Sequence, residues 1–192
     1  RTELARWILP RLQSTVAEAT DALDGYHPTR AARAVEALTD DLSNWWLRRS
    51  RRRFWKGASD TDKAAAYDTL WECLEALSRR MAPIAPFAAE WRYGLLGHDV
   101  SVHLQRYPTA DASRLDADLE GRMALARAVT TATLALRNEA SLNVRQPLRS
   151  LLVVPGVGGV DEGVLRAVED VSLSEGNVKT LETASGDSGA VV

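Results

Sequence analysis

The sequence predicts a mainly α-helical fold, in which a helical bundle over residues 1–142 is followed by a small, truncated α/β appendage over residues 143–192. Apolar residues recur every three or four positions through most of the first 140 residues, which is the period of a helix with one buried face. Glycine and proline interrupt this pattern where the helices of an up-and-down bundle would be joined. After residue 149 short β-branched runs replace the helical period, so a β-α-β unit should follow.

Two helices are expected in the first 55 residues. The first covers residues 2–24 and ends at Gly25, and its apolar stripe consists of Leu4, Ile8, Leu12, Val16, Ala19 and Leu23. Pro10 lies inside this stripe, and because an interior proline costs about 3 kcal/mol, we expect a kink or a later helix start. The second helix opens at His27 or Thr29 and runs to Trp55. Its stripe consists of Ala31, Val35, Leu38, Leu42 and Trp45–Trp46.

The next helices follow in the same way. Ser59 and Asp62 form a capping arrangement that opens a third helix, which Pro83 and Pro86 end. Its stripe consists of Tyr67, Leu70, Trp71, Leu74, Leu77 and Met81. A short helix is expected over residues 87–95, and residues 98–112 should form an irregular connection with an extended patch at 101–105. Ser113 is expected to cap a fourth long helix that runs to about Ala140. Its stripe consists of Leu115, Leu119, Leu125, Val129, Ala132 and Leu136.

The last fifty residues predict a β-α-β unit. A strand over residues 150–154, a turn over 155–159, a helix over 161–170 and a strand over 177–182 succeed one another. Two strands bury little surface, so this unit must dock on the bundle or continue beyond the chain. The small polar tail over residues 184–192 is expected to be mobile.

Composition and isolated residues point away from catalysis in this chain. Formal net charge is −2, Cys73 is the only cysteine, and no apolar run reaches the length of a spanning helix, so a cytoplasmic protein without a membrane segment is expected. The chain lacks an initiating Met and reads as part of a longer polypeptide. The three histidines have no partners at metal-ligand spacing, and Cys73 is expected as a core thiol. Asp40 and Asp41 are interpreted as a polar shoulder that balances Arg48, and residues 155–159 as a turn, because a phosphate loop would need a lysine and a hydroxyl.

One basic segment stands out from this average. Residues 42–59 contain no acidic residue, and they hold the cations Arg48, Arg49, Arg51, Arg52, Arg53 and Lys56. On a helix of 100° per residue, Arg49 and Arg53 continue the buried stripe, where they could pair with acids at a domain junction. The outward side carries Arg48, Arg51, Arg52 and Trp55. Trp55 lies four residues after Arg51, so its ring can accept that guanidinium.

Two kinds of partner would explain this segment. A solvated helix end explains one or two cations, but six without an acid between them repel one another. A polyanion offsets that repulsion, and phosphate matches the arginine fork, so a nucleic acid is favoured. The alternative is a non-catalytic helical interaction domain whose basic face binds an acidic protein or a neighbouring domain.

Several motifs together resemble the C-terminal anticodon-binding domain of isoleucyl-tRNA synthetases, a family of class I aminoacyl-tRNA synthetases. The discriminating piece is DDLSNWWLRRSRRRFWK over residues 40–56, which is similar to the second helix of that domain. RWILPRL at 6–12 resembles its entry helix, with proline where serine is usual, and VRQPL at 144–148 and NVK at 177–179 resemble later motifs. MAPIAPFAAE at 81–90, and SVHL at 101–104 with Pro108, also resemble the valine and leucine relatives, whose equivalent domain is a further alternative.

The resemblance implies a specific job for the chain. It would be the tRNA anticodon-stem and loop binding module of an isoleucine–tRNA ligase, with no catalytic site, metal or cofactor of its own. The full-length enzyme would use ATP and magnesium in a catalytic domain whose signature motifs do not occur in residues 1–192. Implied partners are isoleucine tRNA and the catalytic domain of the same polypeptide. Candidate tRNA-binding residues are Arg48, Arg51, Arg52, Trp55 and Lys56, and candidate domain-junction residues are Arg49 and Arg53. Asn143 stands where a basic residue is frequent, which weakens a phosphate contact at that corner.

Overall fold

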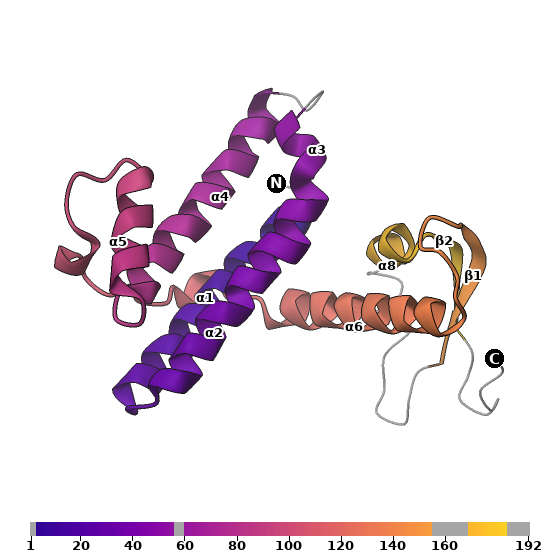
Figure 1. Ribbon diagram of the computed structural model, residues 1–192, viewed down its shortest axis with the longest axis horizontal. Coiled ribbons are helices and arrows are strands. Elements are labelled where there is room, and N and C mark those ends of the chain that lie inside the picture. The colour runs from indigo at the N-terminus through magenta and orange to yellow at the C-terminus, as the bar shows by residue number, and fades with distance from the viewer. Residues whose placement is uncertain (1–2, 56–59, 155–168, 184–192) are drawn as a thin grey trace. The chain divides into compact units, whose positions relative to one another are not determined.

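The structure, a computed structural model, describes residues 3–55, 60–154 and 169–183 (Figure 1). The chain divides into two compact units, Arg1–Asp116 and Ala117–Val192. The first is helical, and the second combines a long helix with a two-stranded parallel sheet, so the predicted mainly α fold class with a small α/β part is confirmed. The domain boundary expected after residue 142 stays a prediction. No helix among the described residues is long and apolar enough to cross a membrane.

The first unit is built on a helical hairpin. Helix α1 (Glu3–Asp24) turns at Gly25–His27 into α2 (Pro28–Asp40), which continues without a break through the π-helix η1 (Asp41–Leu47) into α3 (Arg48–Trp55). Helix α4 (Asp60–Met81) follows, and α5 (Pro86–Leu95) and two short 3₁₀ turns, η2 (Val102–Leu104) and η3 (Ala112–Arg114), complete the unit. Figure 1 shows α2, η1 and α3 as one long rod beside α1.

The core of this unit lies along α1. Its largest fully buried side chains include Ile8, Leu12, Leu38, Trp46 and Leu77, as the helical spacing predicts. The expectation of a later start for the first helix is wrong, because α1 begins at Glu3 and runs through Pro10. Pro10 is itself buried, and packing of the surrounding stripe offsets the backbone hydrogen bond that its ring removes.

Helix α4 buries a face that shares Leu77 with the predicted one but is turned away from Tyr67 and Trp71. Tyr67 and Trp71 are 51% and 47% exposed, whereas the buried positions form a stripe of mostly small residues: Ala66, Thr69, Cys73, Leu77, Ser78 and Arg80. Small side chains let the helices approach closely, and the large aromatic rings then lie at the edge of the contact. Residues 101–105 are also not extended as expected. They contain η2, which Ser101 caps by accepting a hydrogen bond from the His103 N–H.

The second unit contains the predicted parallel pair of strands. Helix α6 (Ala117–Glu139) is followed by β1 (Leu148–Val153), α8 (Glu169–Gly176) and β2 (Val178–Thr183), and Leu148 lies opposite Val178 in the sheet. The turn expected over residues 155–159, most of the helix over 161–170 and the tail over 184–192 lie outside the described residues. The last two positions of that expected helix belong to α8, which extends six residues further.

The start and the buried face of α6 differ from the prediction. Ser113 does not cap α6 but lies in the 3₁₀ turn η3, which Asp111 caps. Leu136, expected on the buried face, is 59% exposed. The buried positions are Leu119, Met123, Ala126, Thr130, Thr133 and Arg137. The two threonines donate their hydroxyl hydrogens to carbonyls one turn earlier, at 2.8 Å each, which leaves their methyl groups free to pack.

Arg137 is the buried charge that joins the parts of the second unit. Its guanidinium donates to the backbone carbonyls of Asn143, Gln146 and Asn177, each at 3.0 Å. The first two lie in the turn after α6 and the third directly before β2. One side chain therefore fixes both connections, and three carbonyl acceptors replace the water that burial removes.

Candidate nucleic-acid interface

The π-helix keeps one face of the basic rod buried. Asp41, Trp45, Arg49 and Arg53 follow one another at steps of four residues, and Leu42, Trp46 and Ser50 do the same. Steps of four drift around a regular α-helix, but a π turn holds more residues and so corrects the drift. The side chains of both series therefore face α1 and α4, and the residues between them remain exposed. The sequence carries no obvious signal for this π segment.

Ion pairs to neighbouring helices fix the rod at the start of η1 and at the tip of α3. At the start of η1, the Arg11 Nε donates to Asp41 Oδ2 at 2.8 Å, and the Asp41 side chain is 3% exposed. At the tip, the Arg53 Nη2 donates to Asp62 Oδ1 at 2.6 Å and its Nε to Oδ2 at 2.9 Å. Asp41 is therefore not a polar shoulder on the surface as expected, because it is a buried partner of α1, whereas a balance of Arg48 by these acids stays a prediction.

Aromatic contacts hold the inner side of the tip. Phe54 makes edge-on contacts with Trp46 and Tyr67, with ring centroids 6.0 and 5.1 Å apart, and so joins α3 to α4. The Arg49 guanidinium lies 5.4 Å from the centroid of the Trp45 ring. In the described part of this rod the cation–π contact thus involves Arg49 and Trp45, rather than Arg51 and Trp55 as expected.

The outer side of the tip carries exposed cations beside an exposed indole. Arg48, Arg51 and Arg52 are exposed and Trp55 is 76% exposed, whereas Arg49 and Arg53 are half-buried, which confirms the predicted two-sided distribution. A concave surface of about 480 Å³ is lined by Arg51, Arg52, Phe54 and Trp55. Lys56 lies outside the described residues.

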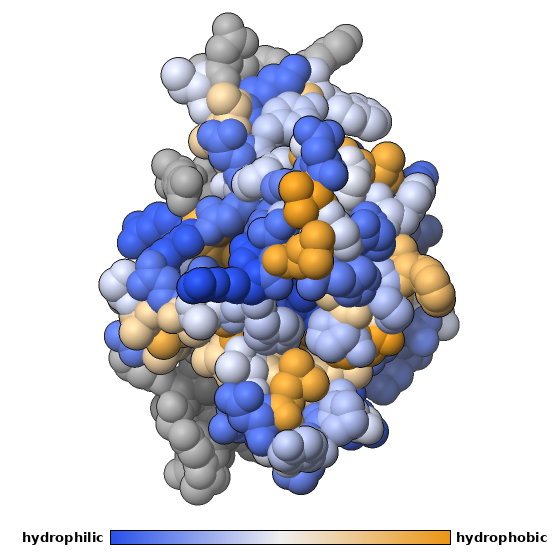
Figure 2. All heavy atoms as spheres, turned by 90° about the vertical axis from the view of Figure 1, so that its left-hand side faces the viewer, coloured by the Kyte–Doolittle hydropathy of each residue, from blue (hydrophilic) through white to orange (hydrophobic). Residues whose placement is uncertain are grey.

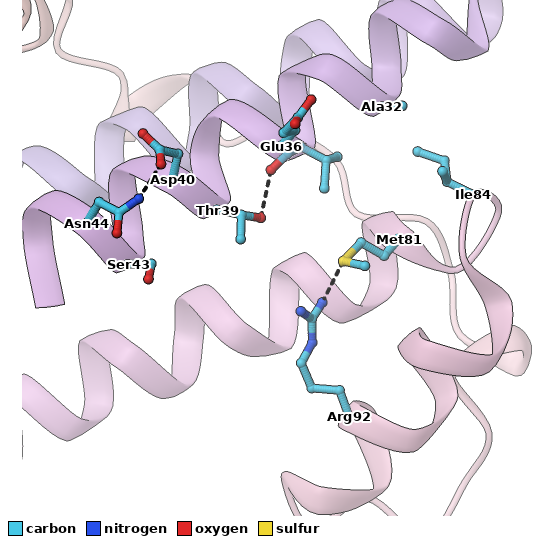
Figure 3. A pocket seen from close by; sticks show the side chains of 10 residues that line it. Ala32, Glu36, Thr39, Asp40, Ser43, Asn44, Met81, Ile84 and Arg92 are labelled. Carbon is cyan, nitrogen blue, oxygen red and sulfur yellow. Dashed lines mark hydrogen bonds between the residues drawn. The ribbon is translucent and has the colours of Figure 1, made fainter.

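A second hollow lies away from this tip and has a different character. It measures about 440 Å³ and lies between α2–η1 and the residues around Met81 (Figure 3). Glu36 and Asp40 line it, and the one arginine there, Arg92, donates to Ser78 Oγ at 2.8 Å and to Met81 Sδ. Burial lowers the pKa of Arg92. Two carboxylates and an inward-turned guanidinium disfavour phosphate at this hollow.

Among the described residues no cluster of histidine, cysteine and carboxylate side chains could hold a metal ion. His98 stacks on Tyr93 with centroids 3.8 Å apart, so its ring is a packing element. Burial raises the pKa of Cys73 to about 12, which keeps it a neutral core thiol as predicted.

Comparisons with known proteins agree with this geometry. Residues 5–152 match the family described as the anticodon-binding domain of tRNA ligase. The chain is 42% identical over 194 residues to the isoleucine–tRNA ligase of Porphyromonas gingivalis, covering all of the chain and 17% of that protein. It is 44% identical to the isoleucine–tRNA ligase of Dehalococcoides mccartyi (93% of the chain, 18% of that protein) and 41% identical to that of Bacillus thuringiensis (94% and 17%). The chain thus spans less than a fifth of the length of these relatives.

Proposed function

The chain belongs to the family of anticodon-binding domains of tRNA ligases, and we propose that the outward face of α3 holds the anticodon stem and loop of isoleucine tRNA. The longer polypeptide would then be an isoleucine–tRNA ligase, in which this contact positions the tRNA for aminoacylation at a catalytic domain that uses ATP and magnesium. Arg48, Arg51, Arg52, Trp55 and Lys56 are the proposed tRNA contacts. The role of Arg49 and Arg53 at a domain junction remains a proposal.

The observation that supports this function most directly is the open cationic surface at the tip of α3. Among the described residues, neither Arg51 nor Arg52 forms an ion pair, and both line the same concave surface as Trp55. Guanidinium groups bind phosphate oxygens through paired hydrogen bonds, and unstacked bases of a single-stranded loop stack on aromatic rings. Recognition of an RNA loop uses arginines that bind the phosphate backbone and an aromatic ring on which a base stacks.

The anchored inner side of α3 should increase the affinity of its outer surface for RNA. Arg53 and Phe54 bind α3 to α4, so the outward side chains project from an anchored helix rather than from a fraying end. Less conformational freedom is then lost when RNA binds. The same charge could attract an acidic protein, and the two kinds of ligand are separated by the experiment below.

The test is the double substitution Arg51→Glu with Arg52→Glu. Affinity for isoleucine tRNA, measured by fluorescence anisotropy, should fall by at least about 100-fold, because each charge-assisted hydrogen bond that is removed is worth roughly 1.5–3 kcal/mol. The slope of log affinity against log salt should shrink by roughly 0.7–0.9 for each phosphate group that the variant no longer binds. Circular dichroism should show an unchanged helical content, because both side chains are exposed.

A matched control is Arg33→Glu with Arg106→Glu, which makes the same change in net charge at two exposed arginines away from α3. This variant should keep most of the affinity and the full salt slope. Equal losses in the two double variants would reduce the effect to overall charge. Unchanged tRNA binding in the α3 variant, in this chain and in the complete ligase, would remove the RNA assignment of that face. Similar affinity for a valine tRNA would remove the preference for isoleucine tRNA.

A further inference from the structure

A row of large apolar side chains lies exposed on α5 and the loop after it. Phe87, Trp91 and Leu95 are 91%, 71% and 67% exposed, and their spacing of four residues places them on one face of the helix. Leu104 of η2 is 78% exposed and Val100 is 52% exposed. Figure 2 views the molecule from the side on which α5 lies in Figure 1, and shows orange apolar groups near the middle of an otherwise mostly blue face.

The inner side of α5 is well packed, so this row is presented by a rigid element. Ala89 and Tyr93 are buried together with Val102, which joins η2 to α5. The Glu90 carboxylate accepts hydrogen bonds from the Ser101 hydroxyl and from the Val102 N–H, both at 2.9 Å. The acid that ends the MAPIAPFAAE segment thus binds the start of the SVHL segment, and the two motifs form one supporting structure for the exposed row.

The charges around this row disfavour a nucleic acid. Residues 83–105 contain one arginine and no lysine, against the acids Glu90 and Asp99. That arginine, Arg92, directs its guanidinium inward to Ser78 and Met81. Within the described residues 83–105, a tRNA backbone would therefore meet no outward-facing arginine or lysine beside Phe87 and Trp91, in contrast to the tip of α3. An apolar protein surface would instead remove these rings from water without a charge penalty.

We propose that the α5 face, defined by Phe87, Trp91, Leu95 and Leu104, docks on an apolar surface of the same ligase polypeptide outside these 192 residues. The inference rests on the assignment of the chain to a ligase. The relatives are more than five times as long as the part this chain matches, so most of such a protein is available to cover the face. Exposed aromatic anchors are what the centre of a protein interface is made of.

The experiment compares two tryptophans of similar exposure, Trp91 at 71% and Trp55 at 76%. Hydroxyl-radical footprinting with mass spectrometry would measure the oxidation rate of each in the 192-residue chain and in the complete ligase. Without tRNA, Trp91 should be oxidised about tenfold more slowly in the complete ligase than in the chain, because an interface anchor is fully desolvated. Trp55 should react equally in both and become protected only when isoleucine tRNA is added.

Each alternative occupant has its own signature. Equal oxidation of Trp91 in the chain and in the ligase overturns the docking proposal, as does protection that appears only with tRNA, which would indicate an RNA contact. If Trp91 is already protected from oxidation in the monomeric 192-residue chain, the second unit covers α5. If the protection of Trp91 increases with chain concentration, a second copy covers α5. Either result overturns the proposal. Failure of tRNA to protect Trp55 overturns the proposed function while leaving the Trp91 result intact.

A pair of substitutions checks the same face by stability. Phe87→Ser with Trp91→Ser should leave the melting temperature of the chain nearly unchanged, since both rings are exposed there. In the complete ligase the same pair should lower the melting temperature of the transition that includes this domain. An unchanged transition in the ligase contradicts the docking.

Discussion

Trp55 and Trp91 are two strongly exposed indoles of this protein, and they lie in opposite electrostatic surroundings. Trp55 ends a helix with five arginines and no acid, whereas Trp91 lies on a helix whose one arginine faces inward and whose acid is bonded to the following loop. Exposure of an aromatic side chain therefore does not identify its partner. The charge around the ring does, because phosphate needs cations and an apolar protein surface needs their absence.

The two surfaces are also held in different ways. The tip of α3 is fixed by the ion pair of Arg53 with Asp62, and η1 before it by the pair of Arg11 with Asp41. The face of α5 is fixed by apolar packing and by one carboxylate that binds backbone and hydroxyl groups. Substitutions at these contacts and at the two indoles measure separately what each surface contributes to stability and to binding.

The largest effect is expected from Asp41→Ala. This substitution leaves Arg11 facing a cavity in place of its carboxylate, and breaking a buried ion pair costs about 3–5 kcal/mol. Because the Arg11 side chain is 22% exposed and keeps some water, we expect a loss near the lower limit, about 3 kcal/mol. Urea unfolding of the chain followed by circular dichroism measures it.

The neighbouring Asp40→Ala is the matched control. Asp40 is exposed and accepts a hydrogen bond from Asn44 one turn later on the same rod. Its removal should change the free energy of unfolding by less than about 0.5 kcal/mol, as is usual at exposed sites. Similar losses at the two adjacent positions would show that the ion pair with Arg11 does not fix the rod.

Helix positions in this chain follow from its sequence more reliably than helix faces do. The three-to-four residue period locates α1, α2, α4 and α5 closely, because periodicity depends only on the alternation of apolar and polar side chains. It misplaced the buried faces of α4 and α6, where threonine, alanine and arginine occupy the interior. The buried threonines are satisfied by carbonyls one turn earlier in their own helices, and Arg137 by carbonyls of other segments. A period of apolar side chains contains neither kind of information.

The sequence predicted part of the candidate interface, because helical periodicity alone separates the two sides of α3. The inward and outward arginines of α3 separate on a simple helical wheel, and their burial agrees. The partners could not be read in this way: Arg53 meets Asp62 and Arg11 meets Asp41 across separate helices. The exposed row on α5 was also missed, because Phe87, Trp91 and Leu95 resemble an ordinary buried stripe until the structure places other residues in the core.

A smaller effect should separate the two indoles by their contribution to RNA binding. Trp55→Ala should weaken binding of isoleucine tRNA to the chain by about 1–3 kcal/mol, the value of a base stacked on an aromatic ring. Trp91→Ala should leave that affinity within about twofold, because the one arginine of its helix, Arg92, is directed inward to Ser78 and Met81. Anisotropy titrations at one salt concentration measure both. An equal loss for the two substitutions would contradict the division of the molecule into an RNA face and a protein face.

The smallest effect concerns the ion pair at the tip of α3 and depends on pH. The hydrogen bond from Arg53 lowers the pKa of Asp62 below its ordinary value of 3.8. Since the folded pKa lies below the unfolded one, the stabilising contribution is complete at neutral pH and is lost as pH falls through the folded pKa. Asp62→Asn should therefore be slightly less stable than the parent chain at neutral pH, and the difference should disappear in the range below pH 3.8. Asp68→Asn, at an exposed position of the same helix, should show no such convergence, and urea unfolding across this pH range compares the three proteins. A stability difference that persists unchanged into acid would mean that Asp62 acts through packing, and that charge pairing does not hold α3 against α4.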